Sequence, residues 1–112
     1  MNIASIYAKM GTRGMTAYSA SKGAVLGMTM PLARDLGPLK IRVVTLSPSV
    51  LKTPMTAVMP DKMIKILMRE SATRDLAPPS DFANLVKGVI ENEYLNATTI
   101  EFWGGLVLPN LW

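Results

Sequence analysis

The sequence contains no cysteine and no histidine among its 112 residues. Without cysteine, the chain can form neither a disulfide framework nor a thiolate metal site. Without histidine, it lacks the ligands of the usual zinc sites and the base of Ser-His and Cys-His catalytic groups. No apolar run reaches the roughly 18 residues that indicate a membrane span, and the first residues do not have the pattern of a secretory signal. The available chemistry is therefore that of hydroxyls, amines and carboxylates.

Charged residues are also scarce, at 18% of the chain, whereas hydrophobic residues make up 49%. This composition predicts one small folded domain with a buried core rather than a disordered chain. The net charge of +4 is concentrated in residues 1–52, where seven Lys and Arg residues face Asp35 alone. These basic residues stand singly, without interleaved aromatic residues, so we expect an anionic small ligand rather than a nucleic acid.

Strand and helix patterns alternate along the chain. The apolar, β-branched segment 41–47 predicts a strand that is buried on both faces of a parallel sheet. The other expected elements are the end of a strand at 2–5, a helix over 17–36, a helix that opens at Pro60 and Asp61, a helix from Ser80 and a strand over 98–103. This order predicts an α/β layered fold with parallel strands. Because so few strands are complete, residues 1–112 are expected to form a single partial domain.

Two of the expected helices carry further signals. Thr16 is the predicted N-cap of the helix over 17–36, and Pro31 is expected to kink that helix or to interrupt one of its hydrogen bonds. Ser80 is the predicted cap of the last helix. That helix has an amphipathic stripe that should pack on the sheet, formed by Phe82, Leu85, Val86, Val89 and Ile90.

Tyr18 and Lys22 stand four residues apart in the stretch YSASKGAVLGMTM at 18–30, so they share one face of the expected helix. A free phenol has a pKa of about 10 and is a poor base at neutral pH, but a nearby ammonium favours its phenolate form. Such a phenol can exchange a proton with an oxygen that changes charge during a reaction. A hydroxyl near a strand end, such as Ser5, could hydrogen-bond to the same oxygen. These groups suit the interconversion of an alcohol and a carbonyl, with the hydride coming from a cofactor.

The pair alone is weak evidence, because a surface tyrosine beside a lysine occurs by chance in many helices. Its context is more specific. NIAS at 2–5 and AYSASKGAVLGMT at 17–29, with 13 positions from Ser5 to Tyr18, closely resemble the active-site segment of the short-chain dehydrogenase/reductase family. The resemblance continues through LARDLGPLKIRVVTLSPSVLKTPM at 32–55 and, more loosely, to WGG at 103–105.

This resemblance implies the C-terminal, catalytic half of a Rossmann-like doubly wound parallel sheet. It also implies hydride transfer between NAD(H), with NADP as an alternative, and a secondary alcohol or ketone. Ser5 would orient the substrate oxygen, Tyr18 would be the general acid/base, and Lys22 would stabilise the phenolate and bind the nicotinamide ribose. The loop after the second strand matches the family's PGxxxT position. Its residues that would hold the nicotinamide end of the cofactor are Pro48, Ser49, Leu51 and Thr53.

The sequence departs from the family pattern at three points. Ser49 replaces a glycine, and a serine there would be strained if the position needs a positive φ. Trp103 replaces an aspartate, so the packing around it is open to question. The glycine-rich turn and the acidic residue that reads the ribose have no counterpart here, so we expect the N-terminal nucleotide-binding half to be absent from these residues.

Within the family, ASKGAVLGMTMPLARDL and IENEYLNATTI look most like the mitochondrial type-2 3-hydroxyacyl-CoA dehydrogenases, also called 17β-hydroxysteroid dehydrogenase type 10. That branch implies a 3-hydroxyacyl-CoA or steroid substrate, a homotetramer and a mitochondrial location; otherwise a cytoplasmic one is expected. The small residues of the helix over 17–36 suit close packing against a second subunit. Residues 55–79, with Met55, Met59 and Met63, are a candidate substrate lid, and plain core packing is an equal alternative for these methionines.

Two other functions stay open at this point. The chain could be a catalytically inactive partial chain that keeps the interface helix and binds a full-length relative. It could also bind nucleic acid through its basic half, which predicts salt-sensitive retention on a polyanion. We rank the second of these last.

Overall fold

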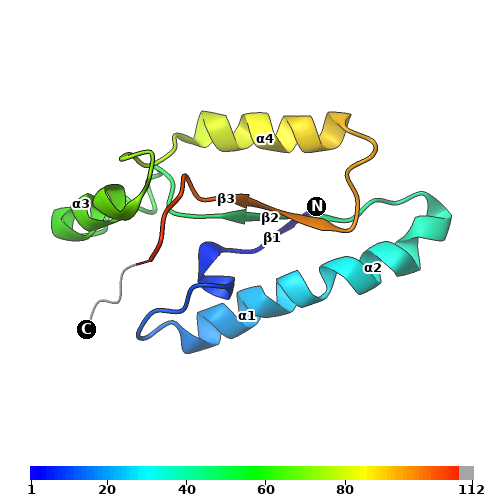
Figure 1. Cartoon of the computed structure of the whole chain (residues 1–112), viewed down its shortest axis with the longest axis horizontal. Coiled ribbons are helices and arrows are strands. Elements are labelled where there is room, and N and C mark those ends of the chain that lie inside the picture. Colours follow the sequence, from blue (N-terminus) through cyan, green and yellow to red (C-terminus); the bar gives the residue numbers. More distant parts are fainter. Residues whose placement is uncertain (109–112) are drawn as a thin grey trace.

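The computed structural model describes residues 1–108, which form a parallel sheet with helices on both faces (Figure 1). Strand β2 (Val44–Pro48) is central and pairs with β1 (Asn2–Ile3) on one side and β3 (Thr98–Phe102) on the other. Both pairings are parallel, as strands joined by crossover helices require. The predicted α/β class and the predicted order of elements are therefore confirmed.

The central strand is buried on both faces, as its composition predicts. Its residues from Val44 to Ser47 are all buried, and Leu46 lies opposite Ile3 of β1 and Ile100 of β3. The strand begins at Val44 rather than at residue 41.

Arg42 accounts for this later start. Its guanidinium donates hydrogen bonds to the carbonyls of Val89 (3.1 Å), Ile90 (3.1 Å) and Leu95 (2.9 Å). Arg42 thus caps the last turn of the helix over Pro79–Glu91 instead of extending the strand. Its positive charge suits a helix C-terminus.

The helices cover the two faces of the sheet. Helices α1 (Thr16–Gly27) and α2 (Thr29–Leu36) cross one face, and α4 (Pro79–Glu91) covers the other (Figure 1). Helix α3 (Asp61–Glu70) begins at the predicted residues and lies beyond the carboxyl ends of the strands. The loops after β1 and β2 open toward this same end, which is where open α/β sheets bind ligands.

The single helix predicted over 17–36 is in fact two helices. The Thr29 hydroxyl donates to the Val25 carbonyl at 3.1 Å and shares a 2.7 Å hydrogen bond with the Thr45 hydroxyl of β2. A threonine hydroxyl bonded to the carbonyl four residues back bends a helix, and Pro31 removes one backbone N–H shortly afterwards. The interruption therefore comes from Thr29 together with Pro31, not from a proline kink alone.

Both predicted helix caps are wrong. Thr16 is the first residue of α1, and Met15 takes the N-cap position without a side-chain hydrogen bond. Ser80 lies inside α4, which begins at Pro79 after an N-cap at Pro78. Proline has the φ angle of a first helical turn and no N–H that needs a cap, so α4 begins there without one.

Most of the predicted stripe on α4 packs against the sheet. Val89 is buried with Val44 and Leu46, and the residues packed around them include Phe82, Leu85 and Val86. Ile90 is the exception, because it is 61% exposed. It lies about 80° around the helix from Phe82, at the rim of the stripe, and there it faces solvent.

A second core lies at the carboxyl ends of the strands. Its buried members are Ile6, Leu67, Leu76 and Leu106. Ile6 belongs to a short 3-10 turn, η1 (Ile6–Ala8), and a similar turn, η2 (Gly37–Leu39), follows α2. Met59 and Met63 pack against this core, whereas Met55 is 83% exposed. Of the three methionines named for the predicted lid region 55–79, Met59 and Met63 thus contact the core in this structure.

A glycine turn attaches the end of β3 to the connection between α3 and α4. Gly104 and Gly105 have φ angles of +58° and +69°. The Gly104 carbonyl accepts hydrogen bonds from the Ser71 hydroxyl (2.8 Å) and the Thr73 N–H (3.1 Å). A Cβ added at Gly105 would lie 2.5 Å from the Ala72 Cβ. Both positions therefore require glycine.

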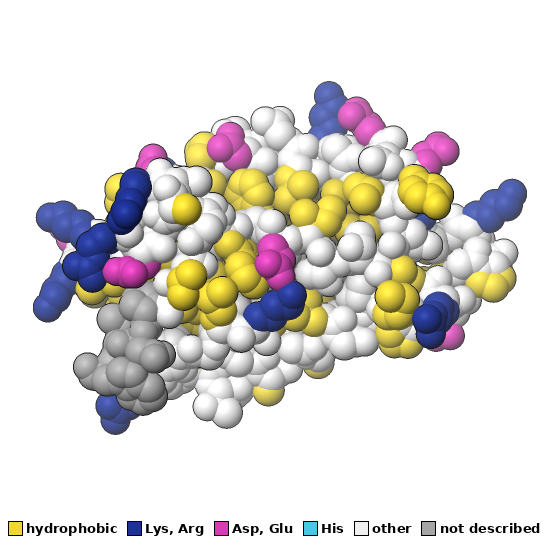
Figure 2. All heavy atoms as spheres, viewed as in Figure 1, with side chains coloured by type: hydrophobic (Ala, Val, Ile, Leu, Met, Phe, Trp, Pro, Cys, Tyr) yellow, Lys and Arg dark blue, Asp and Glu magenta, His cyan; other side chains and the backbone are white. Residues whose placement is uncertain are grey.

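Hydrophobic side chains form a band across the middle of one face, below α4, and most charged side chains lie at its rim (Figure 2). Within residues 1–108, no helix is long and apolar enough to cross a membrane. The same residues contain no group of three or more carboxylates arranged to hold a metal ion.

Candidate active site

Tyr18 and Lys22 lie one turn apart near the start of α1, as their spacing predicts. The Lys22 ammonium donates a hydrogen bond to the Ile3 carbonyl at 3.0 Å and lies 5.8 Å from the centroid of the Tyr18 ring. That distance is within the reach of a cation–π contact. Tyr18 is 42% exposed, so its phenol is open to a small molecule.

The bond from Lys22 to Ile3 fixes the pair relative to the sheet. No residue of α1 is fully buried, so packing alone holds this helix weakly. Ile3 is the last residue of β1, and its carbonyl lies at the strand's carboxyl end. The lysine therefore ties the phenol to the edge of the sheet at which α/β proteins bind ligands.

Ser5 follows β1 directly and lies at the same end of the sheet. It is 7% exposed, and its Oγ accepts a 3.3 Å hydrogen bond from the Tyr7 N–H, which caps η1. Among the described residues, no hydrogen bond joins Ser5 Oγ to the Tyr18 hydroxyl. The hydroxyl hydrogen of Ser5 is therefore available to an incoming oxygen while the turn holds the side chain in place.

Tyr7 is a residue of this site that sequence analysis missed. Its ring contacts the Tyr18 ring edge to face, with centroids 5.9 Å apart and an interplanar angle of 78°. Burial raises the pKa of Tyr7, and the nearby Tyr18 raises that pKa further. Its position two residues after Ser5, at a strand end, is the only signal in the sequence that could have indicated this role.

Pro48 is the last residue of β2, and the loop 49–53 follows it at the same end of the sheet. The Ser49 N–H donates to the Phe102 carbonyl at 3.0 Å, and Leu51 forms an isolated bridge with Ala77. Thr53 is held by Thr56, whose hydroxyl accepts from the Thr53 N–H at 2.9 Å.

The strain considered for Ser49 does not arise. The non-glycine residues with positive φ among those described are Lys40, Arg74 and Ala97. Serine therefore replaces the family's glycine at position 49 without a left-handed backbone.

Trp103, the other departure from the family pattern, is accommodated by packing. Its ring packs against the second core, and its Nε1–H donates a long 3.4 Å hydrogen bond to the Ser47 hydroxyl. The Lys9 ammonium lies 5.9 Å from the ring centroid and also forms an ion pair with Glu101. The indole thus links β3 to β2 and to the segment that follows η1.

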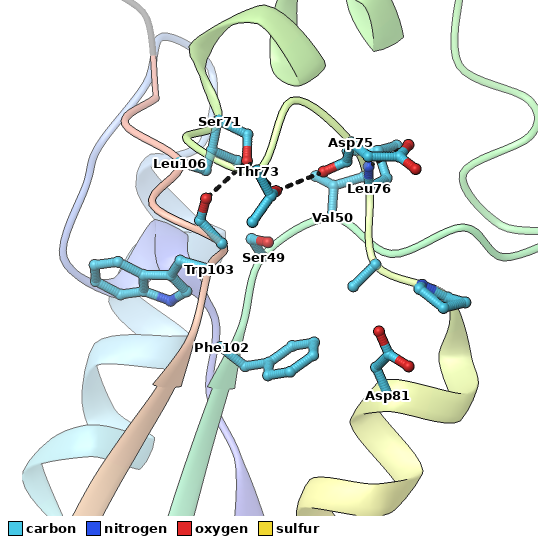
Figure 3. A pocket seen from close by; sticks show the side chains of 13 residues that line it. Ser49, Val50, Ser71, Thr73, Asp75, Leu76, Asp81, Phe102, Trp103 and Leu106 are labelled. Carbon is cyan, nitrogen blue, oxygen red and sulfur yellow. Dashed lines mark hydrogen bonds between the residues drawn. The ribbon is translucent and has the colours of Figure 1, made fainter.

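A cavity of about 330 Å³ opens nearby, between the ends of β2 and β3 and the start of α4 (Figure 3). Phe102 and Trp103 line it together with hydroxyls from Ser49, Ser71 and Thr73. Of the residues predicted for the site, only Ser49 borders it. Ser5, Tyr18 and Lys22 do not, so this cavity is distinct from the reacting centre that the sequence predicts.

The rim of this cavity carries a carboxylate whose charge is stabilised. Asp75 accepts a 2.8 Å hydrogen bond from the Lys52 ammonium and another of 2.8 Å from the Leu76 N–H. These bonds, the first above all, lower the pKa of Asp75. Lys52 is therefore paired with Asp75 and takes no part in the Tyr18–Lys22 pair.

Comparison with known proteins identifies the family. The model of the family described as short chain dehydrogenase matches residues 1–63. The 3-hydroxyacyl-CoA dehydrogenase type-2 of Rattus norvegicus is 44% identical over 107 residues, which are 95% of this chain and 41% of the rat protein. This chain therefore spans about two fifths of the length of that relative.

Solved structures agree. The 3-hydroxyacyl-CoA dehydrogenase type-2 from Mycobacterium avium has a TM-score of 0.89 and 30% identity, over 96% of this chain and 42% of that one. A 3-oxoacyl-[acyl-carrier protein] reductase with bound NAD from Brucella melitensis has a TM-score of 0.83 and 25% identity, over 96% and 40%. The predicted resemblance is confirmed: the chain belongs to the short-chain dehydrogenase family.

Proposed function

We propose that this chain carries the proton-transfer groups of an oxidoreductase that moves hydride between NAD(H) and a secondary alcohol or ketone. The observation that carries the proposal is the Lys22 ammonium, bonded to the last carbonyl of β1 and 5.8 Å from the ring of Tyr18. A phenol beside a fixed positive charge, at the ligand-binding edge of an α/β sheet, is suited to general acid/base catalysis.

Each of the three side chains has its own step in this proposal. During oxidation, the Tyr18 phenolate accepts the hydroxyl proton of the alcohol as the carbon loses hydride. During reduction, the Tyr18 phenol gives a proton to the substrate oxygen as the carbon gains hydride. Lys22 places a positive charge beside the phenol, and Ser5 donates a hydrogen bond to the substrate oxygen. The nicotinamide cofactor, when bound, accepts or supplies the hydride.

The residues present fit the nicotinamide end of such a cofactor. An ammonium has three N–H donors, and the hydrogen bond to Ile3 uses one of those on Lys22. The others are available to ribose hydroxyls. The last residue of β2 and the loop after it are proposed to flank the nicotinamide, through Pro48, Ser49, Leu51 and Thr53. NAD is the proposed cofactor, with NADP as the alternative, and the similar reductase with bound NAD supports this choice.

A 3-hydroxyacyl-CoA is the proposed substrate, with a steroid as the alternative. The names of the similar dehydrogenases from rat and Mycobacterium avium support the acyl-CoA. In residues 55–79, the partly buried Met59 and Met63 offer a flexible apolar wall for an acyl chain. The mitochondrial location implied by the resemblance stays a prediction.

We also propose that copies of this chain associate through α1 and α2. The exposed residues of α1 are small or apolar and none is charged; they include Ala17, Ala20, Ala24 and Gly27. Such a surface lets two helices approach closely. A homo-oligomer would cover it.

The alternative is a catalytically inactive chain that acts only through its interaction surfaces. The observation that favours it is the sheet, in which β1 has a partner on one side only among the described residues. An open edge of this kind can pair with another chain.

A chimera tests the proposal against this alternative. In it, these 112 residues replace the matching 41% of the rat dehydrogenase, with which they share 44% identity. We expect the chimera to bind NADH, measured by its fluorescence, and to reduce NAD⁺ with a 3-hydroxyacyl-CoA. Lys22→Ala should weaken NADH binding, whereas Lys87→Ala on the outer face of α4 should not.

Two outcomes would decide between the functions. A chimera that is folded by circular dichroism and binds NADH, but turns over no hydroxyacyl-CoA, steroid or simple secondary alcohol, would contradict the oxidoreductase. If the 112-residue chain then still bound the intact rat enzyme, the inactive interaction chain would be the better account.

A further inference from the structure

We propose that Tyr7 is a positioning residue of this site, which holds the ring of Tyr18 in the orientation that presents its phenol to the substrate oxygen. The inference rests on the function proposed above and concerns the same site. It begins with η1, the turn that carries Tyr7, because a positioning residue must itself be fixed.

The turn η1 is fixed at both ends and in its middle. Before it, the Ala4 N–H donates to the Leu46 carbonyl at 2.8 Å, which attaches the chain to the central strand. Within it, Ile6 is 0% exposed and accepts a hydrogen bond from the Met10 N–H at 2.9 Å. After it, Lys9 forms its ion pair with Glu101 of β3. The backbone of Tyr7 is therefore anchored at the carboxyl end of the sheet, to β2 through Ala4 and to β3 through Lys9.

The side chain of Tyr7 lies between this anchored turn and the exposed start of α1. It packs against the second core, and its ring meets the Tyr18 ring edge to face at 5.9 Å. Tyr18 has no comparable anchor of its own, because it is 42% exposed on a helix without fully buried residues. The edge-to-face contact is the geometry that aromatic rings prefer, so it restrains how the Tyr18 ring turns.

Two contacts thus bracket the reacting phenol. The Lys22 ammonium lies 5.8 Å from the ring centroid and sets its charge environment, while Tyr7 restrains the plane of the ring. The Tyr7 N–H also donates to Ser5 Oγ at 3.3 Å. Tyr7 therefore touches both Tyr18 and Ser5, and it couples their positions through one short turn.

The raised pKa of Tyr7 suits a residue that does not itself transfer protons. Burial raises the pKa of Tyr7, and the nearby Tyr18 raises it further, so the phenolate form of Tyr7 is disfavoured. Two phenols in contact are in this way assigned different tasks. Tyr18 exchanges the proton, and Tyr7 fixes the ring that does so.

The test compares three variants in the chimera and in the 112-residue chain. Tyr7→Leu keeps apolar volume against the core but removes the aromatic ring, and Tyr7→Phe keeps the ring but removes the hydroxyl. Tyr18→Phe reports on the proposed function itself. We expect Tyr7→Leu to lower kcat by about two- to tenfold, the range that corresponds to an aromatic pair, with a smaller change in KM. Tyr7→Phe should keep wild-type kcat.

A spectroscopic readout separates positioning from general stability. In the 112-residue chain, the Tyr7 ring should shift the ring NMR signals of Tyr18. In Tyr7→Leu these signals should move toward those of the exposed Tyr94. In Tyr7→Phe they should stay in place. Unchanged Tyr18 signals in Tyr7→Leu, or wild-type kcat in that variant while Tyr18→Phe is inactive, would overturn the positioning role alone. Full activity of Tyr18→Phe would instead overturn the proposed function.

Discussion

At the residue scale, the candidate site depends on hydrogen bonds that reach from side chains to strand-end carbonyls and turns. Lys22 reaches back to Ile3, and Ser5 accepts from Tyr7. Both contacts lie at the carboxyl end of β1, so the ammonium and the hydroxyl are fixed relative to the sheet rather than to each other. The ring of Tyr18 contacts Tyr7 edge to face and lies 5.8 Å from the Lys22 ammonium.

The carboxylate of Asp75 gives a pH dependence at this scale. Its hydrogen bond from Lys52, and then that from the Leu76 N–H, lower the pKa of Asp75 below its usual value of 3.8. A lowered pKa stabilises the fold above the unfolded value, and this contribution is lost as the pH falls through the folded one. We therefore expect urea midpoints of the wild type to fall more between pH 6 and about pH 3 than those of Asp75→Asn. Glu93→Gln, which removes an exposed carboxylate, is the control, and an equal fall in Asp75→Asn would contradict the assignment.

At the element scale, short-range features explain where the predictions were right and wrong. The spacing of Tyr18 and Lys22 and the burial of β2 could be predicted, because both follow from local periodicity. The division into α1 and α2 could not, since the Thr29 hydroxyl that bonds back to the Val25 carbonyl is held in place by Thr45 of another element. Contacts between segments distant in sequence leave no periodic trace.

The same argument applies to the residues that the sequence did not indicate. Arg42 caps α4 through the carbonyls of Val89 and Ile90 and also donates to the Leu95 carbonyl beyond the helix, and all three lie 47 or more positions away. The ring contact of Tyr7 with Tyr18 likewise depends on how η1 folds back on α1. Ser49 shows the reverse case: the family pattern suggested strain, but the backbone needs no positive φ there.

The glycine turn after β3 gives a prediction about this element. In Gly105→Ala, the new Cβ would lie 2.5 Å from that of Ala72 in a backbone with φ of +69°. We expect a loss of about 2–4 kcal/mol in the free energy of unfolding, from left-handed strain and the clash together. Urea denaturation measures it. Gly88→Ala in α4, where an added Cβ meets nothing within 4 Å, should instead stabilise by about 0.5–1 kcal/mol. Equal effects at both glycines would contradict this account.

At the scale of the whole molecule, residues 1–108 leave much apolar surface uncovered. The Cα radius of gyration is 15.2 Å and the extents are 49 × 29 × 23 Å, whereas a compact domain of this length has a radius of about 13 Å. Met28 and Met30 remain more than 40% exposed at the junction of α1 and α2. This exposed surface supports the association proposed above.

Self-association of the chain tests this indication. We expect the 112-residue chain to show concentration-dependent association in analytical ultracentrifugation. Ala20→Glu on α1 should weaken it by about tenfold or more, because the interface would bury an unpaired carboxylate. Ala83→Glu on the exposed face of α4 is the matched control and should associate as the wild type does. A wild type that stays monomeric at every concentration would contradict the proposed interface.

The central claim is that Tyr18 is the general acid/base of a hydride-transfer site. The most direct measurement is the rate of NAD⁺ reduction by the chimera carrying Tyr18→Phe, beside the same chimera carrying Tyr94→Phe, which changes a tyrosine that is 98% exposed. The account predicts that Tyr18→Phe lowers kcat by about 100-fold or more while NADH binding persists, and that Tyr94→Phe leaves kcat unchanged. Equal kcat values for the two variants would contradict it.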